Sequence, residues 1–151
     1  MELILWRHAE AEDTDPDLAR ALTPKGRHQA QKMAHWLKSQ FTGPVRILSS
    51  PAVRTRQTAD ALGLPYDLSE QIAPDRSADD LLAASGWPDG HGLVILVGHN
   101  PAISVLASRL ASTSGPPVAM RRAQACWVVF DGDSRQPGVK AMMTPSLLEA
   151  G

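Results

Sequence analysis

The fold of this chain is decided by residues 3–10, LILWRHAE, close to its first residue. Leu3–Trp6 is an unbroken apolar run, which predicts a buried strand. The run stops at Arg7 and His8. In an open α/β sheet, ligands bind beyond the carboxyl ends of the strands, so this polar pair marks a candidate site. A histidine there can act as a nucleophile, and an adjacent arginine can hold a phosphate through two N–H groups. The alternative is a strand that ends in a solvated turn.

The size and charge of the chain limit its class. Its 151 residues fit one ordinary domain, and we predict a single domain over residues 1–151. The net charge of −1 gives no global field toward nucleic acid or a membrane. No apolar run approaches membrane-spanning length, and no basic-then-apolar leader precedes the first strand. We therefore expect a cytoplasmic protein with neither a nucleic acid nor a membrane as partner.

Neither cysteine nor histidine spacing predicts a metal centre. Cys126 is the single cysteine, which excludes an internal disulfide and a thiolate zinc cluster. It lies in an apolar run and is expected to be a core residue. His28 and His35 lie seven residues apart on a predicted helix, with no further ligand candidate nearby. We expect no metal and no cofactor.

A second candidate position follows the predicted strand Val45–Ser49. Ser50 is predicted to be the N-cap of the next helix, with Pro51 in its first turn. Arg54 then lies near the helix N-terminus, where the helix dipole disfavours a cation, and such local conflicts often mark function. Arg56 is turned about 200° away around the helix and is not expected to serve the same pocket.

A third position follows Leu93–Val97, whose continuous apolar character predicts a central strand. His99 comes directly after it, Asn100 is predicted to cap the next helix, and Pro101 to start it. One strand-end histidine is a weak signal. Two of them, with an arginine at a third comparable place, form a constellation.

The remaining pattern predicts a three-layer α/β/α sandwich with a mainly parallel central sheet and helices on both faces. Thr23 and Pro24 predict a helix that ends before Gly43, and Ser77 predicts a short helix over Asp79–Ala84. The apolar runs Ala125–Phe130 and Gly138–Met143 predict a hairpin-like edge. The order of the strands does not follow from the sequence.

Three segments in this order resemble the histidine phosphatase (phosphoglycerate mutase-like) superfamily: Leu5–Glu10 (LWRHAE), Ser49–Ala59 (SSPAVRTRQTA) and Val97–Pro101 (VGHNP). The short length, the RHAEA sequence that begins at Arg7, and LTPKG at residues 22–26 resemble its SixA-type phosphohistidine phosphatase branch. The resemblance implies the phosphoglycerate mutase-like fold and covers most of the chain.

The resemblance also implies residue roles. His8 is implied as the nucleophile that accepts the phosphoryl group, with Arg7, Arg54 and His99 binding its oxygens. This is chemically coherent, because phosphoryl transfer depends mainly on positioning and on stabilising spread negative charge. The implied partner is a phosphorylated protein, such as a histidine phosphotransfer domain of a signalling phosphorelay. Glu10 is a further candidate contact to the substrate.

A general acid is not evident. Larger family members carry one on an insertion that precedes the second histidine, and here that region is short. The candidate acids are Glu70, Asp75, Asp79 and Asp80, with Glu10 in the first loop. An alkoxide leaving group needs a proton in the transition state, whereas an imidazole needs less help. The missing acid therefore favours phosphohistidine over a sugar-phosphate ester.

Two other functions remain open. One is a phosphatase or mutase for a small phosphoester or nucleotide, and the other is a phosphate-binding module without turnover. Arg121 and Arg122, which precede the strand at Ala125, are either solvated charges or reach the substrate.

Overall fold

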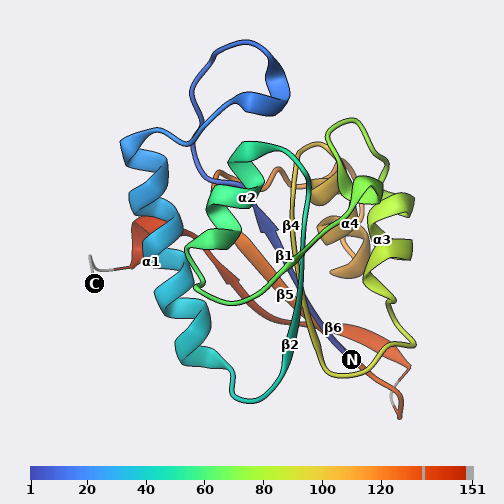
Figure 1. The fold of residues 1–151 in the computed structure, drawn as a ribbon. Coiled ribbons are helices and arrows are strands. Elements are labelled where there is room, and N and C mark those ends of the chain that lie inside the picture. The colour runs from blue at the N-terminus through green and yellow to red at the C-terminus, as the bar shows by residue number, and fades with distance from the viewer. Residues whose placement is uncertain (134, 149–151) are drawn as a thin grey trace.

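The computed structural model describes residues 1–133 and 135–148, arranged as one central sheet between two layers of helices (Figure 1). The strands are β1 (Glu2–Arg7), β2 (Val45–Ser49), β3 (Asp67–Leu68), β4 (Leu93–Gly98), β5 (Ala125–Asp131) and β6 (Gln136–Met143). The helices are α1 (Pro24–Gln40), α2 (Val53–Asp60), α3 (Ala78–Ser85) and α4 (Ala102–Leu110), with 3-10 turns η1 (Asp17–Ala19), η2 (Glu70–Ile72) and η3 (Pro145–Leu147). The predicted three-layer α/β/α class is confirmed.

The sheet has the order β3-β2-β4-β1-β5-β6. β1, β2, β3 and β4 run parallel, β5 is antiparallel to β1, and β6 pairs antiparallel with β5 as the predicted hairpin. Because β2, β4 and β1 are parallel neighbours, their carboxyl ends meet at one edge of the sheet. That edge is where the three sequence segments of interest begin.

Each face of the sheet has its own hydrophobic core, as the alternation of side chains along a strand requires. Ile4 and Trp6 of β1 pack with Met33 and Leu37 of α1 on the face that α1 and α2 cover. Leu3 and Leu5 of β1 point to the other face. There they join Leu81 of α3 and Leu106 of α4, and Cys126 of β5. The cysteine is a core residue as predicted, and burial raises the pKa of its thiol to about 11.

The helix starts at Thr23 and Ser77 agree with the sequence predictions. The Thr23 hydroxyl accepts a hydrogen bond from the Gly26 amide at 2.9 Å, which caps α1. Ser77 and Asp80 form a capping box, in which each side chain accepts a hydrogen bond from the backbone amide of the other residue.

The predicted caps at Ser50 and Asn100 are wrong. The N-cap of α2 is Ala52, and the N-cap of α4 is Pro101. Ser50 instead hydrogen-bonds the imidazole of His99, and the Asn100 amide donates to the carbonyl of Met120. Both side chains thus make tertiary contacts near the sheet edge in place of local helix caps.

Within residues 1–133 and 135–148, no helix combines the length and the apolar character needed to cross a membrane.

Gly26 in the first turn of α1 lies directly against the backbone of Glu10. A Cβ at Gly26 would lie 2.0 Å from the Glu10 carbonyl oxygen, and a backbone atom cannot yield as a flexible side chain does. We expect Gly26→Ala to lower the free energy of unfolding by about 1–3 kcal/mol, the usual cost of overpacking.

Urea denaturation followed by circular dichroism measures this change. Gly138→Ala is the matched control, because nothing lies within 4 Å of the position that its Cβ would occupy. An unchanged urea midpoint for Gly26→Ala would show that Glu10 and α1 are not in contact as described.

Candidate active site

Four sequence-predicted residues meet in one cavity of about 410 Å³ at the carboxyl edge of the sheet. Arg7 is the last residue of β1 and His8 follows it, His99 follows β4, and Arg54 is the second residue of α2. The same cavity is also lined by Ala11, Asp17, Arg20, Pro74, Asp75, Asn100 and Arg122. The parallel arrangement of β1, β2 and β4 thus brings together residues that are up to 92 positions apart in sequence, from Arg7 to His99.

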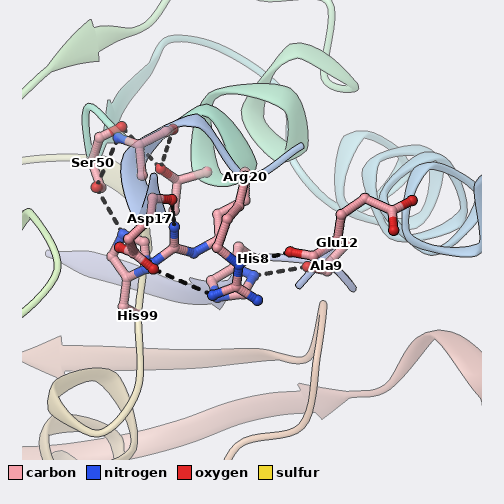
Figure 2. Close-up of polar contacts among 10 residues, drawn as sticks. His8, Ala9, Glu12, Asp17, Arg20, Ser50 and His99 are labelled. Atoms are coloured by element: carbon pink, nitrogen blue, oxygen red, sulfur yellow. Dashed lines mark hydrogen bonds and ion pairs between the residues drawn. The ribbon is translucent and has the colours of Figure 1, made fainter. Parts of the chain in front are cut away.

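His8 is held in one tautomer by the backbone. Its Nδ1 lies 2.7 Å from the carbonyl oxygen of Ala9 (Figure 2). A carbonyl only accepts, so Nδ1 must carry the proton and Nε2 must carry the lone pair. No described residue hydrogen-bonds Nε2. The Ala9 amide donates to Thr58 Oγ1 of α2 at 3.1 Å, which anchors the residue whose carbonyl orients the ring.

Burial also keeps His8 neutral. Loss of hydration is the largest cause and lowers the pKa of His8 to about 4. The hydrogen bond to Ala9 opposes that shift, whereas the charges of Arg54, Arg7 and Arg20 add to it. At neutral pH the ring therefore has an available lone pair, as a nucleophile requires.

His99 is positioned by Ser50, a residue that the sequence predicted only as a helix cap. The Ser50 hydroxyl and His99 Nε2 are 2.7 Å apart, and both residues are buried. The rings of His8 and His99 are 5.3 Å apart between centroids. Burial, followed by the neighbouring His8 and Arg54, lowers the pKa of His99 to about 3. The two imidazoles are thus close, neutral and separately oriented.

Arg7 and Arg54 bring two guanidinium groups to the cavity. Arg7 Nη1 donates to the Met120 carbonyl at 2.9 Å. Burial and the nearby charge of Arg122 lower the pKa of Arg7, but a guanidinium remains protonated at neutral pH. Arg56, as predicted, faces elsewhere and lines a separate cavity with Asp60.

Asp17 in the first loop is a site residue that sequence reasoning missed. Its backbone carbonyl accepts from Arg54 Nη1 at 2.9 Å, and its carboxylate pairs with Arg54 Nη2 at 3.2 Å. Arg20 binds the same carboxylate (Figure 2). Partial burial raises the pKa of Asp17, but Arg54 and Arg20 outweigh it and leave the pKa below its usual value. The acidic composition of the loop was the available signal.

Glu10 lies beside the cavity without lining it. Its carboxylate accepts from the Thr23 hydroxyl at 2.7 Å and pairs with Arg122 at 3.2 Å. Arg122 itself lines the cavity, so of the two arginines before β5 this one reaches the site, while Arg121 does not line it. Direct contact between Glu10 and a substrate stays a prediction.

The four candidate acids that the sequence offers between α2 and His99 lie in different surroundings. Asp75 lines the cavity and has a left-handed backbone conformation, with φ of 73°. Asp79 pairs with Arg109 at 2.6 Å, and Asp80 belongs to the capping box of α3. Glu70 is exposed in η2. Asp75 is therefore the acid of this group that the fold brings to the site.

Among the residues that the structure describes, no group of three or more histidine, cysteine or carboxylate side chains is arranged to hold a metal ion. His28 and His35 are both exposed on α1.

A neutral imidazole with a directed lone pair, flanked by two guanidiniums and a second imidazole, is a site suited to phosphoryl transfer. Comparison with known proteins agrees. The family profile of the histidine phosphatase superfamily (branch 1) matches residues 3–76. The phosphohistidine phosphatase SixA of Escherichia coli (strain K12) is 29% identical over 127 residues, which are 78% of this chain and 79% of that protein.

Two further similarities cover most of the chain. An uncharacterised protein of Mycobacterium tuberculosis (strain H37Rv) is 32% identical over 125 residues, 76% of this chain and 75% of that protein. A solved structure of the protein histidine phosphatase SixA complexed with tungstate has a TM-score of 0.81 at 26% identity, covering 99% of this chain and 100% of that one. This chain belongs to the histidine phosphatase superfamily, and the comparisons support phosphatase activity.

The depressed pKa values of His8 and His99 are directly measurable. We expect the C2–H NMR signals of the two rings to titrate near pH 4 and pH 3, whereas the same histidines in the urea-unfolded chain titrate near about 6.5. Between the folded-state and unfolded-state pKa values, the unfolded chain binds more protons than the folded chain. The contribution of the two histidines to the free energy of unfolding is therefore fully present above pH 6.5 and is lost as the pH falls toward 4. A folded-state midpoint near 6.5 for His8 would contradict the buried, neutral ring.

Proposed function

We propose that this protein is a metal-independent phosphohistidine phosphatase that acts on a phosphorylated protein and forms a phosphohistidine on His8. The observation that carries the proposal is the hydrogen bond from His8 Nδ1 to the Ala9 carbonyl, which directs the Nε2 lone pair while burial keeps the ring neutral. The other groups of the cavity supply positive charge around that nitrogen.

In the first step, His8 Nε2 attacks the phosphorus atom of the substrate. The bond between phosphorus and Nε2 forms as the bond to the substrate imidazole breaks, and the leaving imidazole takes up a proton. The charge on the transferring oxygens is stabilised by Arg7 and Arg54, with His99 as a further contact. Arg7 Nε, Arg54 Nε and His99 Nδ1 are buried without partners among the described residues, so no protein acceptor competes for them.

In the second step, water attacks the phosphorus of the phosphorylated enzyme. The bond to Nε2 breaks, inorganic phosphate leaves, and His8 returns to its neutral form with the proton still on Nδ1. This cycle needs no change in the hydrogen bond to Ala9. The same carbonyl that orients the free ring also stabilises the phosphorylated ring, whose Nδ1–H remains a donor.

The substrate class rests on the leaving group and on the family relationship. An imidazole leaves more readily than an alkoxide and needs less help from a general acid, and Asp75 lies in the cavity as a candidate for that role. The similarity to SixA supports the same class of substrate. Tungstate, with which the SixA structure is complexed, is a tetrahedral oxyanion like phosphate, which supports a phosphate-type substrate for a protein of this class. A histidine phosphotransfer domain is the kind of protein partner that this substrate implies.

The proposal is tested by turnover of a phosphohistidine peptide and of p-nitrophenyl phosphate, each with a metal chelator present. We expect His8→Ala to lower turnover of both substrates at least about a thousandfold, because no other group replaces the nucleophile. His35→Ala is the matched control, since His35 is exposed on α1 and does not line the cavity.

Wild-type activity is expected to survive the chelator, and the phosphohistidine peptide to be the better substrate. Full activity of His8→Ala would overturn the mechanism. Loss of wild-type activity with chelator would overturn metal independence, and turnover of phosphoesters alone would favour the small-molecule alternative. Phosphate binding with no turnover of any substrate would indicate a binding module.

A further inference from the structure

A second cavity, of about 370 Å³, adjoins the candidate active site. It lies between α1 and the segment after β6, which run side by side in Figure 1 (blue and red). We call it the basic groove. Its lining includes Lys25, His28 and Lys32 of α1, Arg121 and Arg122 before β5, and Thr144 after β6.

The groove concentrates positive charge, and of its four cations Arg122 alone is in an ion pair among the described residues, with Glu10. Four of its lining residues are lysine or arginine and none is a carboxylate, although the whole chain has 15 basic and 16 acidic residues. Lys25, Lys32 and Arg121 make no ion pair within residues 1–133 and 135–148. Lys32 Nζ donates instead to the carbonyl of Leu148 at 3.3 Å. Like charges gathered in this way repel one another, and an anionic ligand relieves that repulsion.

The position of Lys25 also indicates that the groove binds an anion. It lies in the first turn of α1, which contains no acidic residue. A cation there is disfavoured by the helix dipole, whereas an acidic residue would stabilise the helix. The charge of Lys25 is therefore not explained by helix stability, and its placement is consistent with binding.

Arg122 connects the basic groove to the candidate active site, because its side chain lines both cavities. Glu10 pairs with Arg122 at 3.2 Å, and the Glu10 amide donates to the side chain of Gln29, another groove residue, at 3.0 Å. A polypeptide whose phosphorylated residue lies over His8 therefore has the groove close by, on the far side of Arg122.

We propose that the basic groove binds an acidic segment of the phosphorylated protein substrate, next to its phosphohistidine. This inference rests on the proposed function. A small phosphoester fills one cavity and does not extend over both, whereas a polypeptide places carboxylates along the groove. In the described part of the chain, no phenylalanine, tyrosine or tryptophan lines the groove, so it lacks the stacking surfaces that single-stranded nucleic acids use.

The test compares two phosphohistidine peptides of equal length, one with aspartates beside the phosphohistidine and one with serines. At low salt we expect the wild-type kcat/KM to be about tenfold higher for the acidic peptide than for the serine peptide, because the KM is lower. We expect the enzyme to lose this preference as added salt screens the charges. The variant Lys25→Gln/Lys32→Gln/Arg121→Gln is expected to lose the preference and to keep wild-type turnover of p-nitrophenyl phosphate.

The matched control removes three exposed cations elsewhere, as Arg27→Gln/Lys38→Gln/Arg46→Gln, and so changes the net charge equally. It is expected to keep the preference for the acidic peptide. Equal kcat/KM for the two peptides in the wild type would overturn the inference, and so would an equal loss of preference in both triple variants. In either case, turnover of the serine peptide that depends on His8 would leave the proposed function standing.

Two further outcomes would also overturn the inference. If a single-stranded RNA inhibits the wild type but not the groove variant, and the peptides are not distinguished, the groove is a nucleic-acid site and the inference is wrong. If neither phosphohistidine peptide is turned over, the proposed function fails and this inference fails with it. Normal turnover of p-nitrophenyl phosphate shows that each variant is folded.

Discussion

The site depends on one hydrogen bond, from His8 Nδ1 to the carbonyl oxygen of Ala9. It fixes which nitrogen of the imidazole bears the lone pair, and it belongs to backbone that the fold holds firmly. β1 lies between β4 and β5, Ala9 is fully buried, and its amide is bound by Thr58 of α2. The direction of the lone pair is therefore set by buried backbone that directly follows a central strand of the sheet.

The electrostatics of the cavity suit the phosphoryl group that we propose it binds. Burial keeps His8 and His99 neutral, so the positive charge at the site comes from arginines that cannot lose it. Asp17 partly balances that charge by binding Arg54 through both its carbonyl and its carboxylate, which also orients the guanidinium. In the proposed mechanism a phosphoryl group brings more negative charge than Asp17, and its oxygens would meet two guanidiniums and an imidazole.

Sequence reasoning predicted the fold class and the four central residues because their signals are local. An apolar run that ends before His8 or His99 identifies both a strand and the polar residues at its carboxyl end, and Arg54 conflicts with the dipole of its own helix. The contributions of Asp17, Asp75 and Ser50 depend on how loops and helix starts pack across the sheet edge, and no local pattern encodes that packing. Ser50 illustrates this, because its hydroxyl binds His99 instead of capping α2.

The most direct test of this account is to identify the phosphorylated atom. In a single turnover quenched with base, we expect one acid-labile phosphate on His8, bonded to Nε2, since Nδ1 is held by Ala9; peptide mapping and two-dimensional NMR of the phosphorylated imidazole distinguish the two nitrogens. Phosphate on Nδ1, or on any residue other than His8, would contradict the claim that the Ala9 carbonyl directs the nucleophile.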